Sequence, residues 1–193
     1  MSTLFNKLNL AKNVLELTLA STEETLKEHF SHEKFAMIKE YLDLATEKLR
    51  EGIQTPPIFI NPQLPLGGLA KEYLDALLRA DRLAASRMII QAVDSGTSLK
   101  DIYMHVFQKS QYEIGRLWQM NEVSVAQEHY CTAATQLIMS QLYPYLFSTP
   151  KNGQKMIATS VGGELHEIGM RMVADFSEMY GWDTYYVRAN TPN

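Results

Sequence analysis

The sequence predicts a mainly α-helical protein with an N-terminal helical hairpin, a four-helix bundle and then the beginning of an α/β unit. Two observations carry this fold class. Apolar residues recur at helical spacing over residues 4–50 and 69–147. After them, a short apolar run at residues 155–161 is followed by a glycine turn and an amphipathic run, which is the order of strand, turn and helix in an α/β unit.

Residues 1–52 are predicted to form the helical hairpin. Its first helix is expected over residues 4–20. Ser21-Thr22-Glu23-Glu24 has the pattern of a capping box and predicts the start of a second helix. This helix is expected to run to Arg50 and to stop at Gly52. The hairpin either packs onto the rest of the chain or pairs with a second copy.

Residues 53–68 contain four prolines and two glycines, which forbid a regular helix and predict a linker. Residues 69–150 are predicted to form the bundle, with helices at 69–79, 81–95, 98–118 and 124–144. Because the connections between them are short, neighbouring helices should run antiparallel.

Residues 151–193 predict a βαβ unit, with strands at 155–161 and 184–187 around a helix at 165–180. A two-stranded sheet is marginal by itself. We therefore expect this α/β part to be truncated.

The turn after the first strand holds the first candidate site. His166 follows the carboxyl end of that strand, where open α/β sheets bind their ligands. Glu164 is close enough to orient the imidazole of His166 and to fix its tautomer. Gly169 leaves room for a large flat ligand near the start of the next helix. The alternative is an ordinary histidine in a surface turn.

A second candidate site combines Trp118, at the end of one predicted helix, with Val125, Glu128 and His129 on the next. The last three residues are spaced i, i+3 and i+4 and therefore share one helical face. An aromatic plate, a carboxylate and an imidazole in one patch would cover a flat ligand with a polar substituent. The alternative is that Trp118 and Val125 belong to the core while Glu128 and His129 form a surface pair.

Both candidate sites resemble cobalamin-binding proteins. Glu164-x-His166-x-x-Gly169 resembles the Asp-x-His-x-x-Gly signature of base-off, His-on cobalamin domains, with Glu in place of Asp. The arrangement of Trp118, Val125, Glu128 and His129 is similar to the upper-face motif of adenosylcobalamin-dependent light-sensing proteins. The likeness runs over about residues 66–193 and implies a helical cap above a Rossmann-like domain.

This resemblance implies a role for each candidate residue. His166 would be the metal ligand, binding cobalt from below, with Glu164 on its other ring nitrogen. Trp118 and Val125 would cover the upper face, while Glu128 would hydrogen-bond the adenosyl group. His129 could then replace that group as an upper ligand after light breaks the cobalt–carbon bond. The output would be altered self-association or a signal through the N-terminal hairpin to a partner.

Two departures from the family pattern keep other ligands open. The strands and helices that enclose the nucleotide tail in the family are absent after Asn193, and Arg188 stands where the family usually has glycine. Besides adenosylcobalamin and methylcobalamin, haem and a bilin therefore remain alternative tetrapyrrole ligands. Cys131 could serve as an attachment point for a bilin, but we expect it to be a buried structural thiol.

Composition excludes several classes of function. A net charge of −4 argues against a nucleic-acid surface, and the sequence lacks an apolar run of membrane-spanning length. With a single cysteine and no signal-peptide pattern at the N-terminus, we expect a cytoplasmic protein. The sequence suggests neither a nucleophile–base pair nor a phosphate loop, so we expect no enzyme with its own turnover and no catalytic residue.

Three functions follow from these residues. The first is a cobalamin-binding sensory module, light-sensitive with adenosylcobalamin and acting through a homo-oligomer or a signalling partner. The second is a corrinoid carrier for methyl transfer, which requires a partner methyltransferase. The third is a helical interaction domain that binds only a protein partner.

Overall fold

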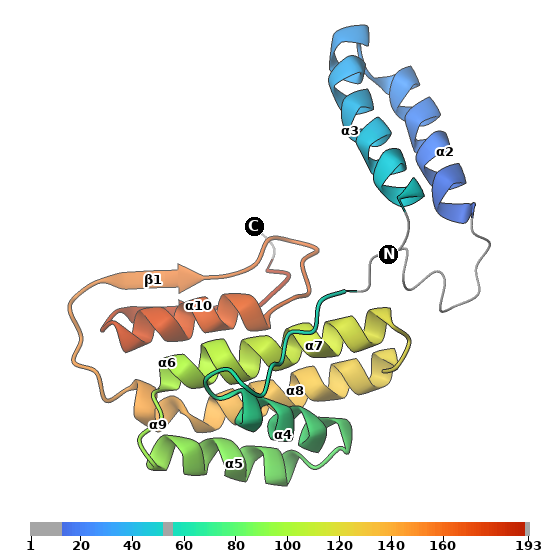
Figure 1. Cartoon of the computed structure of the whole chain (residues 1–193). Coiled ribbons are helices and arrows are strands. Elements are labelled where there is room, and N and C mark those ends of the chain that lie inside the picture. The colour runs from blue at the N-terminus through green and yellow to red at the C-terminus, as the bar shows by residue number, and fades with distance from the viewer. Residues whose placement is uncertain (1–12, 52–55, 192–193) are drawn as a thin grey trace. The chain divides into compact units, whose positions relative to one another are not determined.

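The computed structural model describes residues 13–51 and 56–191 and divides the chain into two compact units. The N-terminal unit comprises residues 1–57 and 116–124. The main unit comprises residues 58–115 and 125–193. The fold is mainly helical with a small parallel sheet, as the sequence predicted (Figure 1).

The hairpin consists of α2 (Val14–His29) and α3 (His32–Arg50), which lie side by side (Figure 1). The predicted helix boundary at Ser21–Glu24 is wrong, because α2 runs straight through these residues. The hydroxyls of Thr22 and Thr25 donate to carbonyls one turn back, at 2.8 and 2.9 Å, instead of capping a new helix. The chain turns at Phe30 and Ser31, whose backbones are extended. Gly52 lies outside the described residues.

The predicted bundle of residues 69–150 forms as follows: α4 (Gly67–Leu78), α5 (Arg82–Asp94), α6 (Leu99–Asp101), the π-helical segment η1 (Ile102–Phe107), α7 (Gln108–Gln119), α8 (Val125–Gln141) and α9 (Tyr143–Leu146). The segments α6, η1 and α7 form one continuous helix, which matches the single helix predicted at 98–118. Side chains cap two of the starts. Asp81 accepts from the amide of Ala84 at 2.9 Å, and Ser98 accepts from that of Asp101 at 3.1 Å.

The core of the main unit centres on the wide turn η1. Ile102, Tyr103, Val106 and Phe107 are all fully buried. A π-helical turn has more residues per turn than an α-helix, so two adjacent pairs of side chains can point inward. The ring of Phe107 packs against those of Tyr73 and Tyr103, with centroids 5.6 and 5.3 Å apart.

The second half of the predicted linker packs onto the bundle. Ile60 is buried, and the amide of Phe59 donates to a carboxylate oxygen of Glu113 at 3.0 Å. The start of α4 lies against the same segment, because a Cβ on Gly67 would stand 2.0 Å from the carbonyl oxygen of Asn61. This close approach requires glycine.

The α/β part consists of β1 (Lys155–Ala158), α10 (Ile168–Met179) and β2 (Asp183–Tyr186). The two strands are parallel, with Lys155 opposite Asp183 and Ala158 opposite Tyr186, so the predicted βαβ order is confirmed. Figure 1 shows α10 between β1 and the helical bundle, and α10 contacts both strands and α9. Within the described residues, no helix combines the length and apolar character needed to span a membrane.

Candidate ligand site

The loop between β1 and α10 is tied to the segment that follows β2. The amide of Gly163 donates to the side-chain oxygen of Asn190 at 2.9 Å, and that of Ser160 donates to the carbonyl of Arg188 at 3.3 Å. Gly163 has φ +86°, a conformation that glycine adopts without steric cost. The loop is therefore bound to the segment after β2 at two points, Ser160 and Gly163.

Glu164 and His166 form a hydrogen-bonded pair in this loop. One oxygen of Glu164 lies 2.6 Å from Nδ1 of His166 and also accepts from the backbone amide of His166 at 2.7 Å. These two bonds, the amide first, lower the pKa of Glu164. A carboxylate on Nδ1 leaves Nε2 as the coordinating nitrogen, and the His166 side chain is 97% exposed.

Gly169 lies in the first turn of α10, close to this pair. A Cβ added at Gly169 would meet no atom within 4 Å. No atom of the protein therefore fills the space beside Gly169 that the sequence analysis assigned to a flat ligand. The binding roles of Glu164, His166 and Gly169 stay predictions.

The first turns of α8 hold the second candidate group. Nδ1 of His129 lies 2.5 Å from one oxygen of Glu128, and the hydroxyl of Thr132 donates to the other oxygen at 3.0 Å. His129 and Val125 are exposed, whereas Glu128 is half-buried. The structure thus brings together the two polar residues of the predicted upper-face motif, with Val125 one turn earlier.

Trp118 is half-buried in the last turn of α7. Its segment, residues 116–124, groups with the N-terminal unit, whereas Val125 begins the next segment of the main unit. The position of Trp118 over the α8 face stays a prediction.

The helix that carries His129 also holds the loop of His166. The side-chain amide of Gln136 on α8 donates to Glu167 at 3.0 Å, and the hydroxyl of Tyr186 donates to the carbonyl of Glu167 at 3.1 Å. Glu167 directly follows His166, and Gln136 lies about two turns along α8 from Glu128 and His129. Both candidate groups are therefore attached to one helix.

A cavity of about 380 Å³ lies between α8, α9, α10 and β2. Three buried charged residues on α10 line it: Arg171, Asp175 and Glu178. Their spacing of i, i+4 and i+7 places them on one face of the helix. The sequence prediction did not include them, because spacing alone does not tell whether a charged face packs inward. Buried charged groups therefore lie at the boundary between α10 and the bundle.

Arg171 and Asp175 form a network across that boundary. The two terminal nitrogens of Arg171 donate to the carbonyl of Gln136 at 2.9 Å and to the hydroxyl of Ser140 at 2.8 Å. The hydroxyl of Tyr103 donates to Asp175 at 2.8 Å. Burial raises the pKa of Asp175 to about 6, against the opposing effects of Tyr103 and Arg171.

Arg188 borders the same cavity and has φ +70°. This left-handed conformation is one that glycine favours, and the resemblance placed a glycine here. The carbonyl of Arg188 accepts from the amide of Ser160 and from the hydroxyl of Thr159, the latter at 3.0 Å. These bonds hold an arginine in a backbone conformation suited to glycine.

Cys131 is fully buried, as predicted for a structural thiol. Burial raises its pKa to about 11, so the reactive thiolate is scarce at neutral pH. This thiol is poorly suited to attach a bilin. The described residues contain no cluster of three or more histidine, cysteine, aspartate or glutamate side chains that could hold a metal.

One known protein family matches the sequence of the bundle. Residues 69–143 match the profile of the B12 binding domain family. This match agrees with the predicted cobalamin-binding bundle and does not separate light sensors from corrinoid carriers. A search of curated proteins found no match.

Three solved structures are similar to this chain. The monomethylamine corrinoid protein of Methanosarcina barkeri aligns with a TM-score of 0.57 and 19% identity over 66% of this chain and 60% of its own. The methanol:cobalamin methyltransferase complex of the same organism aligns with a TM-score of 0.41 and 15% identity, covering 88% and 60%. A cobalamin-binding protein from Desulfitobacterium hafniense aligns with a TM-score of 0.33 and 17% identity, covering 64% and 58%. The first likeness shows a shared fold, and the chain spans about three fifths of each protein's length.

Proposed function

We propose that this protein binds cobalamin between the exposed start of α8 and the loop of residues 161–167, and that it acts as a corrinoid carrier. The observation that carries the proposal is the Glu164–His166 pair. Nδ1 of His166 lies 2.6 Å from the carboxylate of Glu164, and the imidazole of His166 is exposed. A histidine with Nδ1 engaged in this way is oriented to offer Nε2 to a metal.

The matched family supports cobalamin as the ligand, because residues 69–143 match a B12 binding domain. The fold shared with a corrinoid protein of M. barkeri supports carriage of a methyl group as the task. Bound cobalamin supplies a cobalt–carbon bond that holds a methyl group or, with an adenosyl group instead, breaks in visible light. A carrier of this kind would deliver its group to a separate methyltransferase.

The protein's own residues would position and cover the ligand. Glu164 would fix the ring orientation of His166, and Gln136 would hold the loop through Glu167 at 3.0 Å. Val125 is the exposed apolar residue at the start of α8, where it could cover one face of a flat ligand.

The decisive experiment uses cobinamide, a corrinoid that lacks the nucleotide tail and therefore cannot supply its own lower nitrogen ligand. The purified chain is loaded with reduced cobinamide and its electron paramagnetic resonance spectrum is recorded. We expect hyperfine splitting from one axial nitrogen, which changes when the histidines carry ¹⁵N.

His166→Ala should abolish this splitting, while His32→Ala, an exposed histidine on α3, should leave it unchanged. A spectrum without nitrogen splitting in the wild-type chain would overturn the role of His166. Failure to retain cobinamide, cobalamin or methylcobalamin would overturn cobalamin binding itself.

The pair on α8 favours light sensing as a second candidate. Nδ1 of His129 lies 2.5 Å from a carboxylate oxygen of Glu128. The resemblance assigns both residues to the adenosyl group. Reconstitution in the dark with adenosylcobalamin, followed by green light, tests this function. A light-driven change in absorption and sedimentation that Glu128→Gln removes would support the sensor. Tight binding of methylcobalamin with no response in sedimentation would favour the carrier.

A further inference from the structure

The cavity between α8, α9, α10 and β2 contains a buried donor without a partner. Nε of Arg171 forms no hydrogen bond with any described residue, although Arg171 is only 8% exposed. The two terminal nitrogens of Arg171 are engaged by Gln136 and Ser140. Nε lies 3.9 Å from a carboxylate oxygen of Asp175, too far for a hydrogen bond. Because a buried unpaired donor costs free energy, this nitrogen indicates an acceptor from outside the chain.

Asp175 supplies an acceptor next to this donor. One of its oxygens accepts from the hydroxyl of Tyr103 at 2.8 Å, and the other accepts no hydrogen bond from the described residues. Arg171 and Asp175 are spaced i, i+4 on α10 and therefore lie side by side. The cavity of about 380 Å³ is far larger than the roughly 30 Å³ that one water molecule occupies. It therefore has room for a ligand group that offers an acceptor and a donor together.

The charges around the cavity favour a neutral ligand, because the two signs are equally represented. Three side chains are cationic: Arg171, Arg188 and Lys151, the last of which is bound to Glu178. Three are anionic: Glu167, Asp175 and Glu178. A neutral ligand preserves this balance, whereas a carboxylate or an ammonium group would bury a net charge.

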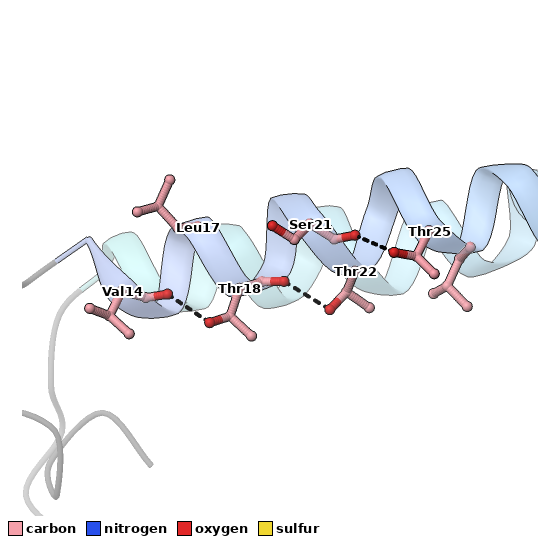
Figure 2. Close-up of a pocket in the computed structure, with 7 residues that line it drawn as sticks. Val14, Leu17, Thr18, Ser21, Thr22 and Thr25 are labelled. Atoms are coloured by element: carbon pink, nitrogen blue, oxygen red, sulfur yellow. Dashed lines mark hydrogen bonds between the residues drawn. The ribbon is translucent and has the colours of Figure 1, made fainter.

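The groove along α2 differs from this cavity (Figure 2). Its lining residues are uncharged. The hydroxyls of Thr18, Thr22 and Thr25 already donate to carbonyls one turn back at 2.8 to 2.9 Å (Figure 2). Hydroxyl donors that are bonded within the helix are not available to a ligand. The cavity beside α10 is therefore the stronger candidate for a polar ligand.

We propose that this cavity receives a primary carboxamide, whose oxygen accepts from Nε of Arg171 and whose nitrogen donates to Asp175. A carboxamide is neutral and carries an acceptor beside a donor, which matches the two unpaired groups. The proposal rests on the proposed function, because corrinoids carry primary carboxamides around the edge of the corrin. The cavity borders the corrinoid site, since Glu167 lines it and directly follows His166. One edge carboxamide would enter the cavity while His166 holds the metal.

The test compares two corrinoids by calorimetric titration of the full chain. Cobinamide carries the carboxamides, whereas the heptamethyl ester of cobyrinic acid keeps the carbonyl acceptors and lacks the N–H donors. In Asp175→Asn, the hydroxyl of Tyr103 can still donate to the remaining oxygen, so the introduced nitrogen takes the place of the free acceptor. We expect this variant to bind cobinamide at least about 10-fold more weakly and the ester with unchanged affinity. The unchanged ester affinity also verifies that the site is folded.

Two further variants complete the comparison. Arg171→Lys removes Nε and should weaken both corrinoids by a similar factor, because both carry the carbonyl. Asp94→Asn is the matched control. Asp94 also accepts from a tyrosine hydroxyl, that of Tyr145 at 2.7 Å, but does not line the cavity. This variant should bind both corrinoids as wild type does.

The outcomes separate this proposal from the proposed function. Wild type that binds cobinamide no more tightly than the ester would overturn the carboxamide site and leave corrinoid binding intact. An Asp175→Asn chain that binds cobinamide normally, or that loses both corrinoids equally, would do the same. An Arg171→Lys chain with normal affinity for both would overturn the contact to the carbonyl. A wild-type chain that binds neither corrinoid would overturn both proposals.

Discussion

Asp175 is the residue whose ionisation most directly affects the joint between α10 and the bundle. Its side chain is buried beside Tyr103 and Arg171, and burial raises its pKa to about 6 from the ordinary value of 3.8. Because the pKa of Asp175 is higher in the folded state than in the unfolded state, the folded state binds this proton more tightly. The contribution to stability is therefore full below pH 3.8 and is lost as pH rises through 6.

We predict that Asp175→Asn removes this pH dependence. Between about pH 4 and pH 7, the free energy of unfolding should fall by on the order of 2 kcal/mol more in wild type than in the variant. Urea unfolding at several pH values measures this difference. Because other carboxylates titrate in both proteins, the comparison isolates Asp175. Equal pH profiles for the two proteins would show that Asp175 does not titrate as its burial implies.

Glu164 tests the positioning of His166 without removing the imidazole. We predict that Glu164→Gln lowers the affinity for cobinamide by about 10- to 100-fold, as loss of a carboxylate behind a metal-bound histidine does. Calorimetric titration gives the affinity. Glu33→Gln, an exposed position on α3, is the control for loss of one negative charge. Equal affinities in all three proteins would contradict a positioning role for Glu164.

At the scale of elements, the start of α4 contains two adjacent glycines in opposite situations. A Cβ on Gly67 would stand 2.0 Å from the carbonyl oxygen of Asn61, whereas one on Gly68 would meet nothing within 4 Å. We predict that Gly67→Ala destabilises the protein by more than about 2 kcal/mol through this clash. Gly68→Ala should stabilise it by about 0.5–1 kcal/mol, because alanine is a better helix former.

Urea unfolding of the two alanine variants measures both effects against one wild-type curve. The opposite signs matter more than the sizes, because both substitutions add one methyl group to the same turn. Two variants with equal stability would mean that the segment around Asn61 moves away from α4 without cost.

The sequence predicted best those parts of the fold that are determined by contacts between residues close together in the chain. Helical spacing was sufficient for the bundle. The caps that the structure shows at Asp81 and Ser98 are equally local, because those hydrogen bonds form within one turn. The predicted helix boundary at Ser21 was wrong. Ser21 lies inside a continuous apolar pattern, where helix propagation outweighs the tendency of serine to cap a new helix, so α2 continues through it. The break at Phe30 and Ser31 carries neither glycine nor proline.

The candidate site divides in the same way. The Glu164–His166 contact spans two residues and was predicted from spacing alone. The contact between Tyr103 and Asp175 joins residues 72 positions apart, which a single sequence does not reveal. The spacing of Arg171, Asp175 and Glu178 places them on one helix face, but it does not reveal that this charged face is buried.

At the scale of the whole molecule, the two units differ in what stabilises them. The main unit has a buried core around η1, whereas α2 and α3 bury no residue. Local opening is easiest where few apolar contacts are lost. The hairpin should therefore open far more readily than the bundle.

We predict that hydrogen exchange separates the two units. The amides of α2 and α3 should exchange fast while those of η1 and α8 stay protected, because α2 and α3 contain no buried residue and few apolar contacts are lost when they open. Mass spectrometry of peptides from both regions, recorded on the full chain, measures the difference. Protection of the hairpin equal to that of η1 and α8 would contradict the prediction.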